Sequence, residues 1–250
     1  MNIFKYSNIK EFFSHLKKNY EVTSLRDWDN GNQIILRFDV DLDISYAYQM
    51  AQLLKEVGVP ATFFIMTSCP LYNPLSKRNQ EKLRKMSEDG FEIGLHFDPT
   101  VYPNIGPGEL QVRVDMEASV LESITKKKVE SVSTHNPSVH GKYPLFSGYK
   151  NAYASEIFGE DRYLSDSWQH LHHDPYEFIK GVRNHPVQIA LHPFHYSVNG
   201  EGYRELFIGF AKKFLDGVDE EFMTNSDNRE YIRHLGPGIS EHFCGNQNKK

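Results

Sequence analysis

The sequence has few cysteines, no long apolar run and no strong basic cluster. Its two cysteines, Cys69 and Cys244, are too few for a disulfide framework, so we expect a reduced, cytoplasmic setting. No apolar stretch approaches the ~18 residues of a membrane-spanning segment. Polar residues interrupt the apolar runs at the start of the chain, which therefore does not resemble a signal peptide. The net charge is −5 and the longest basic run is the triplet at 126–128, which argues against a nucleic-acid partner.

Signatures of several common enzyme classes are also missing. There is no G-x-S-x-G motif, the mark of many serine hydrolases. There is no G-x-G-x-x-G motif and no P-loop, so the sequence shows neither of these nucleotide-binding motifs. Histidine, in contrast, is abundant: the chain has 12, and six of them fall between His170 and His195. This clustering is the first indication of chemistry.

The chain alternates predicted strands and helices. Its composition, 39% hydrophobic and 24% charged, is globular, and its 250 residues suit one α/β barrel. Short apolar runs predict strands at 34–38, 61–66, 91–95, 129–134, 162–164 and 187–191. Helical spacing predicts helices at 44–57, 78–89, 109–127, 152–158, 176–182 and 204–215. Repeated β–α units imply a parallel sheet, either open or closed into a barrel.

We predict a single domain over residues 1–250. Residues 1–30 form an N-terminal helix and connector, and residues 236–250 form a tail that frays. Asp43 is expected to cap the helix at 44–57, and Gly58 to end it. In the helix at 109–127, the apolar residues expected on one side are Val112, Met116, Val120, Leu121 and Ile124.

Five predicted strands end in polar or ionisable residues. These are Asp39, Asp41 and Asp43 after the first strand, His96 and Asp98 after the third, His135 and Asn136 after the fourth, Ser165, Asp166 and Ser167 after the fifth, and His192 and His195 after the last. In a parallel α/β sheet the carboxyl ends of the strands share one rim, where sites are built. The sequence therefore predicts a site on this rim.

Asp39 and Asp41 are better explained by a bound cation than by local structure. At a spacing of two in extended chain both side chains point the same way, and two adjacent carboxylates are costly without a cation or a proton between them. Asp43, in contrast, is better explained as a helix cap.

The other candidates have structural explanations as well. Taken by itself, His96 is better explained as a core histidine. It is a candidate metal ligand only because the aspartates are expected near it. His135 is equally a ligand or a turn residue, because an Asn-Pro pair follows it. Asp166 could cap a turn and His192 could pack at a strand end. The histidines at 170–173 are expected in a solvated polar loop.

Two imidazoles and a carboxylate suit a divalent transition metal with open positions for water and substrate. Such a metal lowers the pKa of its water and polarises a carbonyl. A free carboxylate beside it can take the proton from the water, and a histidine can protonate the leaving group. From the residues alone, Asp39 or Asp41 is the base and the other a ligand, with His192 as the acid.

The ordered motifs IILRFDVDLD, PATFFI, GFEIGLHFD, STHNP, YLSDS and IALHP resemble the polysaccharide deacetylases with a NodB homology domain, a carbohydrate esterase family 4-like group. The resemblance is strongest to the divergent branch of surface-polysaccharide and O-antigen clusters, and it covers residues 34–196, the expected catalytic core. It implies an irregular β/α barrel, a divalent metal with zinc as first choice, and removal of an N- or O-acetyl group from a sugar.

The resemblance also implies roles for single residues. Asp39 matches the catalytic base, Asp41 the metal-binding aspartate and His96 the first metal histidine. Asp166 matches the acid that orients a histidine, and His192 the catalytic acid.

The sequence departs from the family pattern at several positions. The usual second metal histidine, four residues after the first, is Thr100 here. His135 then becomes the best third ligand, with Asp98 as an alternative. His135 and Asn136 also stand where relatives carry arginine, and Val40 separates two aspartates that the family normally has adjacent.

We therefore expect a metal-dependent sugar deacetylase in surface-glycan biosynthesis. Its substrate would be a cytoplasmic sugar nucleotide or a lipid-linked glycan, with substrate contacts from Asn136, Trp168, Tyr196 and His195. A catalytically silent glycan-binding barrel is the alternative, since Thr100 replaces a ligand and Tyr102, Tyr143, Trp168 and Tyr196 could stack on sugar rings. Hydrolysis of another amide, ester or phosphoester bond ranks third, because few basic residues lie on the rim.

Overall fold

The computed structural model describes residues 2–137 and 143–224. The chain divides into two compact units, residues 1–200 and 201–250, and each is described by itself. The tail predicted at 236–250 lies outside the described residues, and the single domain over 1–250 stays a prediction. Within the described ranges, no helix combines the length and the apolar character that crossing a bilayer requires.

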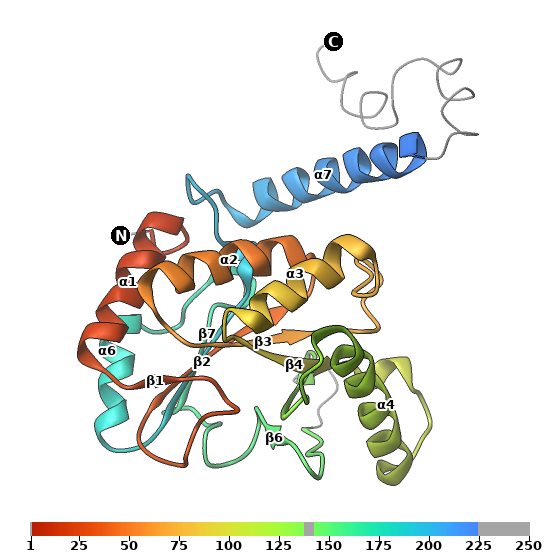
Figure 1. Cartoon of the computed structure of the whole chain (residues 1–250). Helices are drawn as coiled ribbons and strands as arrows, with labels where there is room; N and C mark the ends of the chain where they lie inside the picture. Colours follow the sequence, from red (N-terminus) through yellow and green to blue (C-terminus); the bar gives the residue numbers. More distant parts are fainter. Residues whose placement is uncertain (1, 138–142, 225–250) are drawn as a thin grey trace. The chain divides into compact units, whose positions relative to one another are not determined.

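A parallel, eight-stranded sheet forms the centre of the first unit (Figure 1). Its order is β6 (Lys150–Asn151), β5 (Ser131–Thr134), β4 (Glu92–Phe97), β3 (Thr62–Ile65), β2 (Ile34–Val40), β8 (Val187–Leu191) and β7 (Tyr163–Ser165), and β1 (Val22–Thr23) pairs with the start of β2. Among the described strands β6 and β7 do not pair with each other, so the curled sheet stays open. The predicted α/β fold with an irregular barrel is confirmed.

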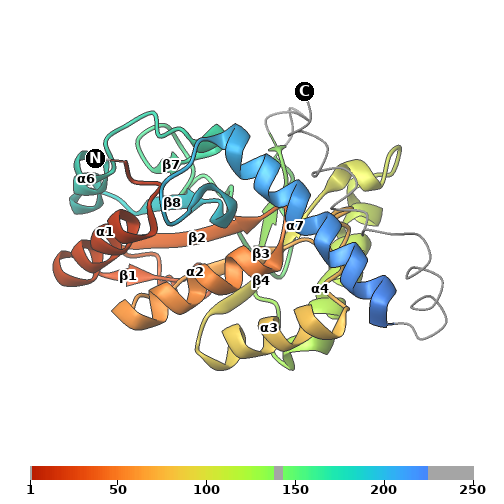
Figure 2. The ribbon, with the colours of Figure 1, turned by 90° about the horizontal axis from the view of Figure 1, so that it is seen from above.

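Helices cover the outer face of this sheet, with α2 and α3 side by side (Figure 2). The helices of the first unit are α1 (Tyr6–Asn19), α2 (Ile44–Val57), α3 (Lys77–Glu88), α4 (Pro107–Thr125) and α6 (Pro175–Phe178), with short 3-10 turns η1 (Pro99–Val101), η2 (Ser167–Gln169), η3 (Ile179–Arg183) and η4 (Pro193–His195). In the second unit, α7 spans Tyr203–Thr224.

The two faces of β2 have different partners. Because side chains alternate along a strand, Leu36 and Phe38 face the helices and join the main apolar core, where Phe38 lies against Phe13 of α1. Ile35, Arg37 and Asp39 occupy the alternate positions on the inner face. All seven residues of the strand are buried, so the inner face holds charged groups out of water.

Glu92, on β4, is another buried charged residue of the sheet. Its carboxylate accepts hydrogen bonds from Thr62 Oγ1 at 2.5 Å, Ser131 Oγ at 2.6 Å and the backbone N–H of Arg26 at 2.8 Å. Burial nevertheless raises the pKa of Glu92 above its usual value, and these hydrogen bonds offset only part of that shift.

Glu92→Gln is expected to remove a pH-dependent part of the stability. Because the folded pKa of Glu92 lies above the unfolded one, its contribution is present below the unfolded pKa and is lost as pH rises through the folded pKa. The unfolding free energy of the Gln variant, relative to that of the wild type, should therefore increase as pH rises. Urea unfolding across the mildly acidic range measures this difference. A free-energy difference that does not change with pH would contradict this.

Two local predictions are wrong. Residues 152–158 form turns, not a helix, because the side-chain amide of Gln188 on β8 binds the carbonyls of Ala152 at 2.9 Å and Ile157 at 3.2 Å. In α4, Val112 and Met116 are 53% and 54% exposed. The buried side of α4 instead includes Glu117, which accepts hydrogen bonds from Thr67 Oγ1 and from the Tyr102 hydroxyl. Of the five residues expected on one side of this helix, Leu121 and Ile124 are buried as predicted.

Candidate active site

The predicted rim residues converge at the carboxyl ends of the strands. Asp39 and Asp41 end β2, His96 lies on β4, and His135 directly follows β5. Asp166 follows β7 and His192 follows β8. A cavity of about 270 Å³ opens among them, and its lining residues are Asp39, Asp41, His96, His135, Asn136, Pro137, Tyr143, Tyr153, Phe158, Tyr163, Ser167 and His192.

Asp41, His96 and His135 form a set that could hold a metal ion. One donor atom from each lies within 4.8 Å of the others. His96 Nε2 is 3.2 Å from Asp41 Oδ1, and His135 Nε2 is 4.0 Å from the same oxygen. Two imidazole nitrogens and one carboxylate oxygen match the donors of a catalytic transition-metal site with open positions.

The orientation of His96 indicates which of its nitrogens faces a cation. His96 Nδ1 lies 3.1 Å from the carbonyl oxygen of Ser133, which can only accept, so Nδ1 carries the proton. His96 Nε2 then faces Asp41 Oδ1, a buried oxygen that has no hydrogen-bond partner among the described residues, at 3.2 Å. Either a proton on Nε2 or a bound cation between the two atoms would satisfy both.

Electrostatics at this triad favour negative charge on Asp41. Burial alone would raise the pKa of Asp41, but His96, His192 and His135 more than offset it and hold that pKa well below its usual range. Burial likewise lowers the pKa of His96, yet Asp39 and Asp41 raise it above the usual value. For His135, burial and the neighbouring His96 lower the pKa, which leaves its imidazole neutral and able to bind a metal.

Asp39 is held by a buried arginine. Arg37 is fully buried and donates to Asp39 Oδ2 at 3.0 Å, while the hydroxyls of Tyr153 and Tyr163 lie 3.0 and 3.4 Å from the same guanidinium nitrogen. Gln188 Oε1 accepts from the other end of the guanidinium at 3.2 Å. Asp39 Oδ1 is buried without a hydrogen-bond partner among the described residues, and so one oxygen of this carboxylate is ready to accept a proton.

His192 lies between two acids. Its Nδ1 donates to Asp166 Oδ1 at 2.6 Å, and its Nε2 faces Asp41 Oδ2 at 3.7 Å. Burial lowers the pKa of His192, but Asp166 and then Asp41 raise it more, to about 9. His192 is therefore a positively charged donor whose free nitrogen points into the cavity.

His195, predicted to contact substrate, lies behind Asp166 instead. Its Nδ1 is 3.1 Å from Asp166 Oδ2, its side chain is buried, and it does not line the cavity. Asp166, His192 and His195 also lie close enough to hold a metal. Hydrogen bonds from both histidines to the fully buried Asp166 already account for their arrangement.

Thr100, at the usual position of the second metal histidine, and Asp98, the alternative ligand, lie near His135. Thr100 donates through its hydroxyl to Asp98 Oδ1 at 2.6 Å, within a turn, and does not line the cavity. Asp98 Oδ2 is 3.4 Å from His135 Nδ1, so this acid orients the histidine from the side away from Asp41. Asn136 lines the cavity, and its Nδ2 is 3.0 Å from His135 Nε2. A metal at His135 would require this amide to turn away.

The predicted substrate contacts Trp168 and Tyr196 have different surroundings in the structure. Trp168 is 79% exposed, with φ 57° and ψ 30°, and follows the cavity residue Ser167 without lining the cavity itself. Tyr196 as a rim aromatic is wrong: it is 1% exposed and packs on Phe4. Its position as the last residue of the family resemblance does not indicate this burial.

Three residues of an aromatic wall that lines the cavity were missed from the sequence. Tyr153, Phe158 and Tyr163 pack with ring centroids 4.8 to 6.3 Å apart, and Tyr143, which was expected as a sugar-stacking residue, joins them. Strand alternation could have placed Tyr163 on the inner face, two residues before Ser165. The loop at 170–173 lines a separate cavity of about 400 Å³.

Comparison with known proteins adds a partial family match. The family model "Polysaccharide deacetylase" matches residues 28–136, which is less than half of the chain. The matched segment contains Asp39, Asp41, His96 and His135, whereas Asp166 and His192 lie beyond it. None of the curated proteins matches this chain.

Several solved structures are distantly similar. A peptidoglycan deacetylase of Bacillus subtilis is 16% identical, with coverage of 78% of this chain and 85% of that one and a TM-score of 0.43. A CE4 family pseudoenzyme of Bacillus anthracis is 16% identical (74% and 63% covered, TM-score 0.41). This chain thus spans less than two thirds of the pseudoenzyme. A family 4 acetyl xylan esterase of Clostridium thermocellum, in complex with a cobalt ion, is 16% identical (64% and 73% covered, TM-score 0.39). Similarity at this level transfers no activity to the chain.

Proposed function

We propose that this chain is a metal-dependent hydrolase that removes an N- or O-acetyl group from a sugar. The observation that carries the proposal is the convergence of Asp39 and His192 on the Asp41–His96–His135 triad. The match of residues 28–136 to the polysaccharide deacetylase family supports the same reaction class. We extend the proposal to surface-polysaccharide biosynthesis in the cytoplasm, on the strength of the motif order alone.

Asp41, His96 and His135 are the residues that would hold the metal, with Zn²⁺ as the first choice for two imidazoles and one carboxylate. The unpartnered Asp41 Oδ1 and the Nε2 lone pair of His96 support this assignment. When bound, a divalent metal lowers the pKa of a water molecule and polarises the substrate carbonyl.

The other residues would move and hold protons. Asp39 accepts a proton from water through its unpartnered Oδ1, while Arg37 fixes its Oδ2. His192 donates a proton from Nε2 to the leaving nitrogen or oxygen, and Asp166 keeps His192 Nδ1 protonated and oriented. A base and an acid that both lie beside the triad suit hydrolysis of an amide or ester.

The cavity lining favours an uncharged part of a sugar. Arg37 is the sole cation other than histidine among the described lining or adjoining residues, and Asp39 neutralises it. The aromatic wall offers ring faces for a sugar, and we assign Asn136 and the exposed Trp168 to substrate contacts as well. The acetylated sugar would belong to a sugar nucleotide or a lipid-linked glycan.

A glycan-binding barrel without hydrolysis is the second candidate. The contact of Asn136 Nδ2 with His135 Nε2, together with Thr100 at the usual ligand position, favours it. In this reading the aromatic wall binds sugar while the triad stays without metal.

Removal of the metal is expected to abolish hydrolysis reversibly. Purified protein should contain about one divalent ion per chain, and dialysis against a chelator should remove it together with activity on acetylated sugars. Zinc should restore both, as followed by elemental analysis and acetate release. Hydrolysis that survives complete removal of the metal would refute the proposal, and saturable sugar binding without turnover under several metals would establish the second candidate.

A further inference from the structure

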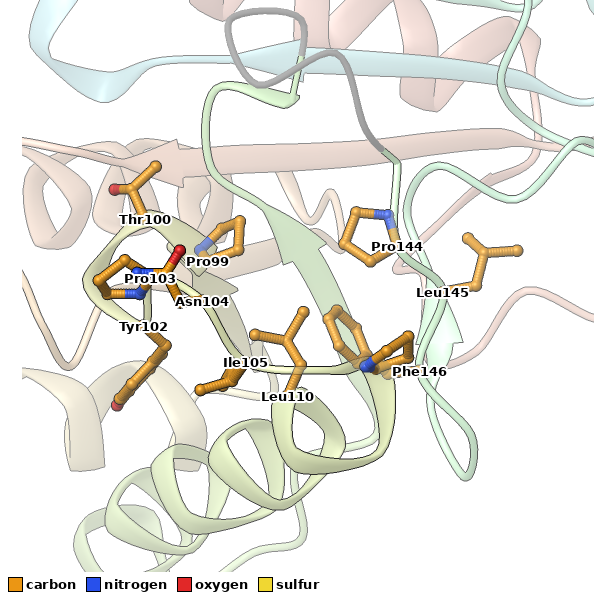
Figure 3. A pocket seen from close by; sticks show the side chains of 11 residues that line it. Pro99, Thr100, Tyr102, Pro103, Asn104, Ile105, Leu110, Pro144, Leu145 and Phe146 are labelled. Atoms are coloured by element: carbon orange, nitrogen blue, oxygen red, sulfur yellow. The ribbon is translucent and has the colours of Figure 1, made fainter.

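A further cavity has a volume of about 540 Å³, and Figure 3 shows the side chains that line it. It opens between the loop after β4, the start of α4 and the segment 144–146. Its lining residues are Pro99, Thr100, Tyr102, Pro103, Asn104, Ile105, Pro107, Leu110, Pro144, Leu145 and Phe146. This apolar cavity is twice as large as the one at the triad.

Its wall suits hydrocarbon and offers little to a sugar or a charged group. No acid, lysine, arginine or histidine is among the described lining residues. The Thr100 hydroxyl already donates to Asp98 and the Tyr102 hydroxyl to Glu117 Oε1 at 2.8 Å. The exposed Asn104 is the other polar side chain among the described lining residues. A sugar has many hydroxyls that need partners when buried, and this wall offers few.

The cavity is held open by rigid neighbours. Four of its lining residues are prolines, whose fixed φ restricts the loop before any ligand binds. Tyr102 stacks on Phe97 with centroids 5.8 Å apart, and Phe146 packs edge-on against the same ring at 5.3 Å. A preformed apolar cavity binds a chain at a lower entropic cost.

The apolar cavity adjoins the candidate active site, although the two share no described lining residue. Asp98 contacts His135 with one carboxylate oxygen and caps the turn that contains Thr100 with the other. Tyr143 lines the active-site cavity, and its neighbour Pro144 lines the apolar one. The two cavities are therefore lined by neighbouring residues of the same segments.

We propose that the apolar cavity binds the hydrocarbon chain of an acyl group longer than acetyl on the sugar substrate. This inference rests on the proposed function. Water would split the acyl C–N or C–O bond, which releases a fatty acid and the free amino or hydroxyl group of the sugar. The lipid of a diphosphate-linked glycan fits less well, because a charged diphosphate separates that lipid from the sugar. An acyl chain is attached directly to the carbonyl that is hydrolysed.

The test compares N-acylglucosamines with acetyl, butanoyl, hexanoyl and octanoyl groups, below the concentrations at which they aggregate. Each added methylene should raise kcat/KM by about threefold to fourfold until the cavity is filled. Calorimetric titration of the same compounds provides a readout that does not depend on turnover, and should show the same rise in affinity.

Leu145→Asp locates the chain. Leu145 is 59% exposed and lines the cavity, so a charge there should lower the octanoyl-to-acetyl ratio by about tenfold without unfolding the protein. Val112→Asp is the matched control, because Val112 is 53% exposed and lies outside the lining, and it should leave the ratio unchanged.

Other results overturn the inference. Hydrolysis of acetyl substrates without any gain for longer chains would refute it and leave the proposed function standing. A chain-length gain that Leu145→Asp leaves intact would place the chain elsewhere, and weaker binding of chito-oligosaccharide in that variant would assign the cavity to sugar. If no substrate is hydrolysed, the proposed function fails, and octanoyl binding by calorimetry still decides the cavity.

Discussion

Asp41→Asn is expected to remove the metal and to lower hydrolysis by about a thousandfold or more. The substitution keeps the shape of the side chain and deletes the only negative charge within the Asp41–His96–His135 triad. Asp41 Oδ1 lies 3.2 Å from His96 Nε2 and accepts no hydrogen bond from the described residues, so its main partner is the expected cation. Elemental analysis and acetate release measure the two losses separately.

Asp161→Asn is the matched control for this variant. The Asp161 side chain is 65% exposed and lies outside the cavity, so its loss should change neither metal content nor rate. Asp41→Asn protein that keeps its metal and its activity would show that the metal is held elsewhere.

Arg37→Met is expected to lower the free energy of unfolding by about 3–5 kcal/mol. Both partners of the Arg37–Asp39 pair are buried, and the variant leaves the Asp39 carboxylate out of water without its cation. At this chain size the loss corresponds to a fall in Tm of about 10 °C. Hydrolysis should fall as well, because Arg37 orients the proposed base. Urea and thermal unfolding measure the stability.

A double variant separates loss of the pair from loss of packing. Adding Asp39→Asn to Arg37→Met removes the stranded charge and should recover part of the stability. Arg162→Met is the surface comparison, since Arg162 pairs with Asp161 in partial exposure, and it should cost about 1 kcal/mol or less. Equal losses for Arg37→Met and Arg162→Met would contradict a structural role for the buried pair.

The sequence was most informative where local signals agreed. Residues 44–57 form a helix within the predicted bounds, because Asp43 accepts a hydrogen bond from the Ser45 backbone N–H at 2.7 Å and Gly58 ends the helix at φ 69°. The strand at 187–191 also has its predicted bounds. Strand ends then placed Asp39, Asp41 and His96 on one rim, because the carboxyl ends of parallel strands are neighbours.

What the sequence could not reveal depends on contacts between distant residues. The hydroxyls of Tyr153 and Tyr163 reach Arg37 across more than a hundred residues, and no local pattern records this. The burial of Tyr196 depends on Phe4 near the other end of the unit. The structure also pairs Arg37 with Asp39, two residues along the same strand.

The order of strands also affects how the protein can be synthesised. β2 lies between β3 and β8, and Arg37 on β2 binds Gln188 on β8, which is 151 residues later in the chain. Once the ribosome has added residue 136, the proposed metal ligands have all been synthesised, but residues 34–38 of β2 have no β8 partner. An unpaired strand edge and an incompletely surrounded charge promote aggregation and the binding of chaperones. The segment with the metal ligands therefore cannot mature before the last strand of the sheet arrives.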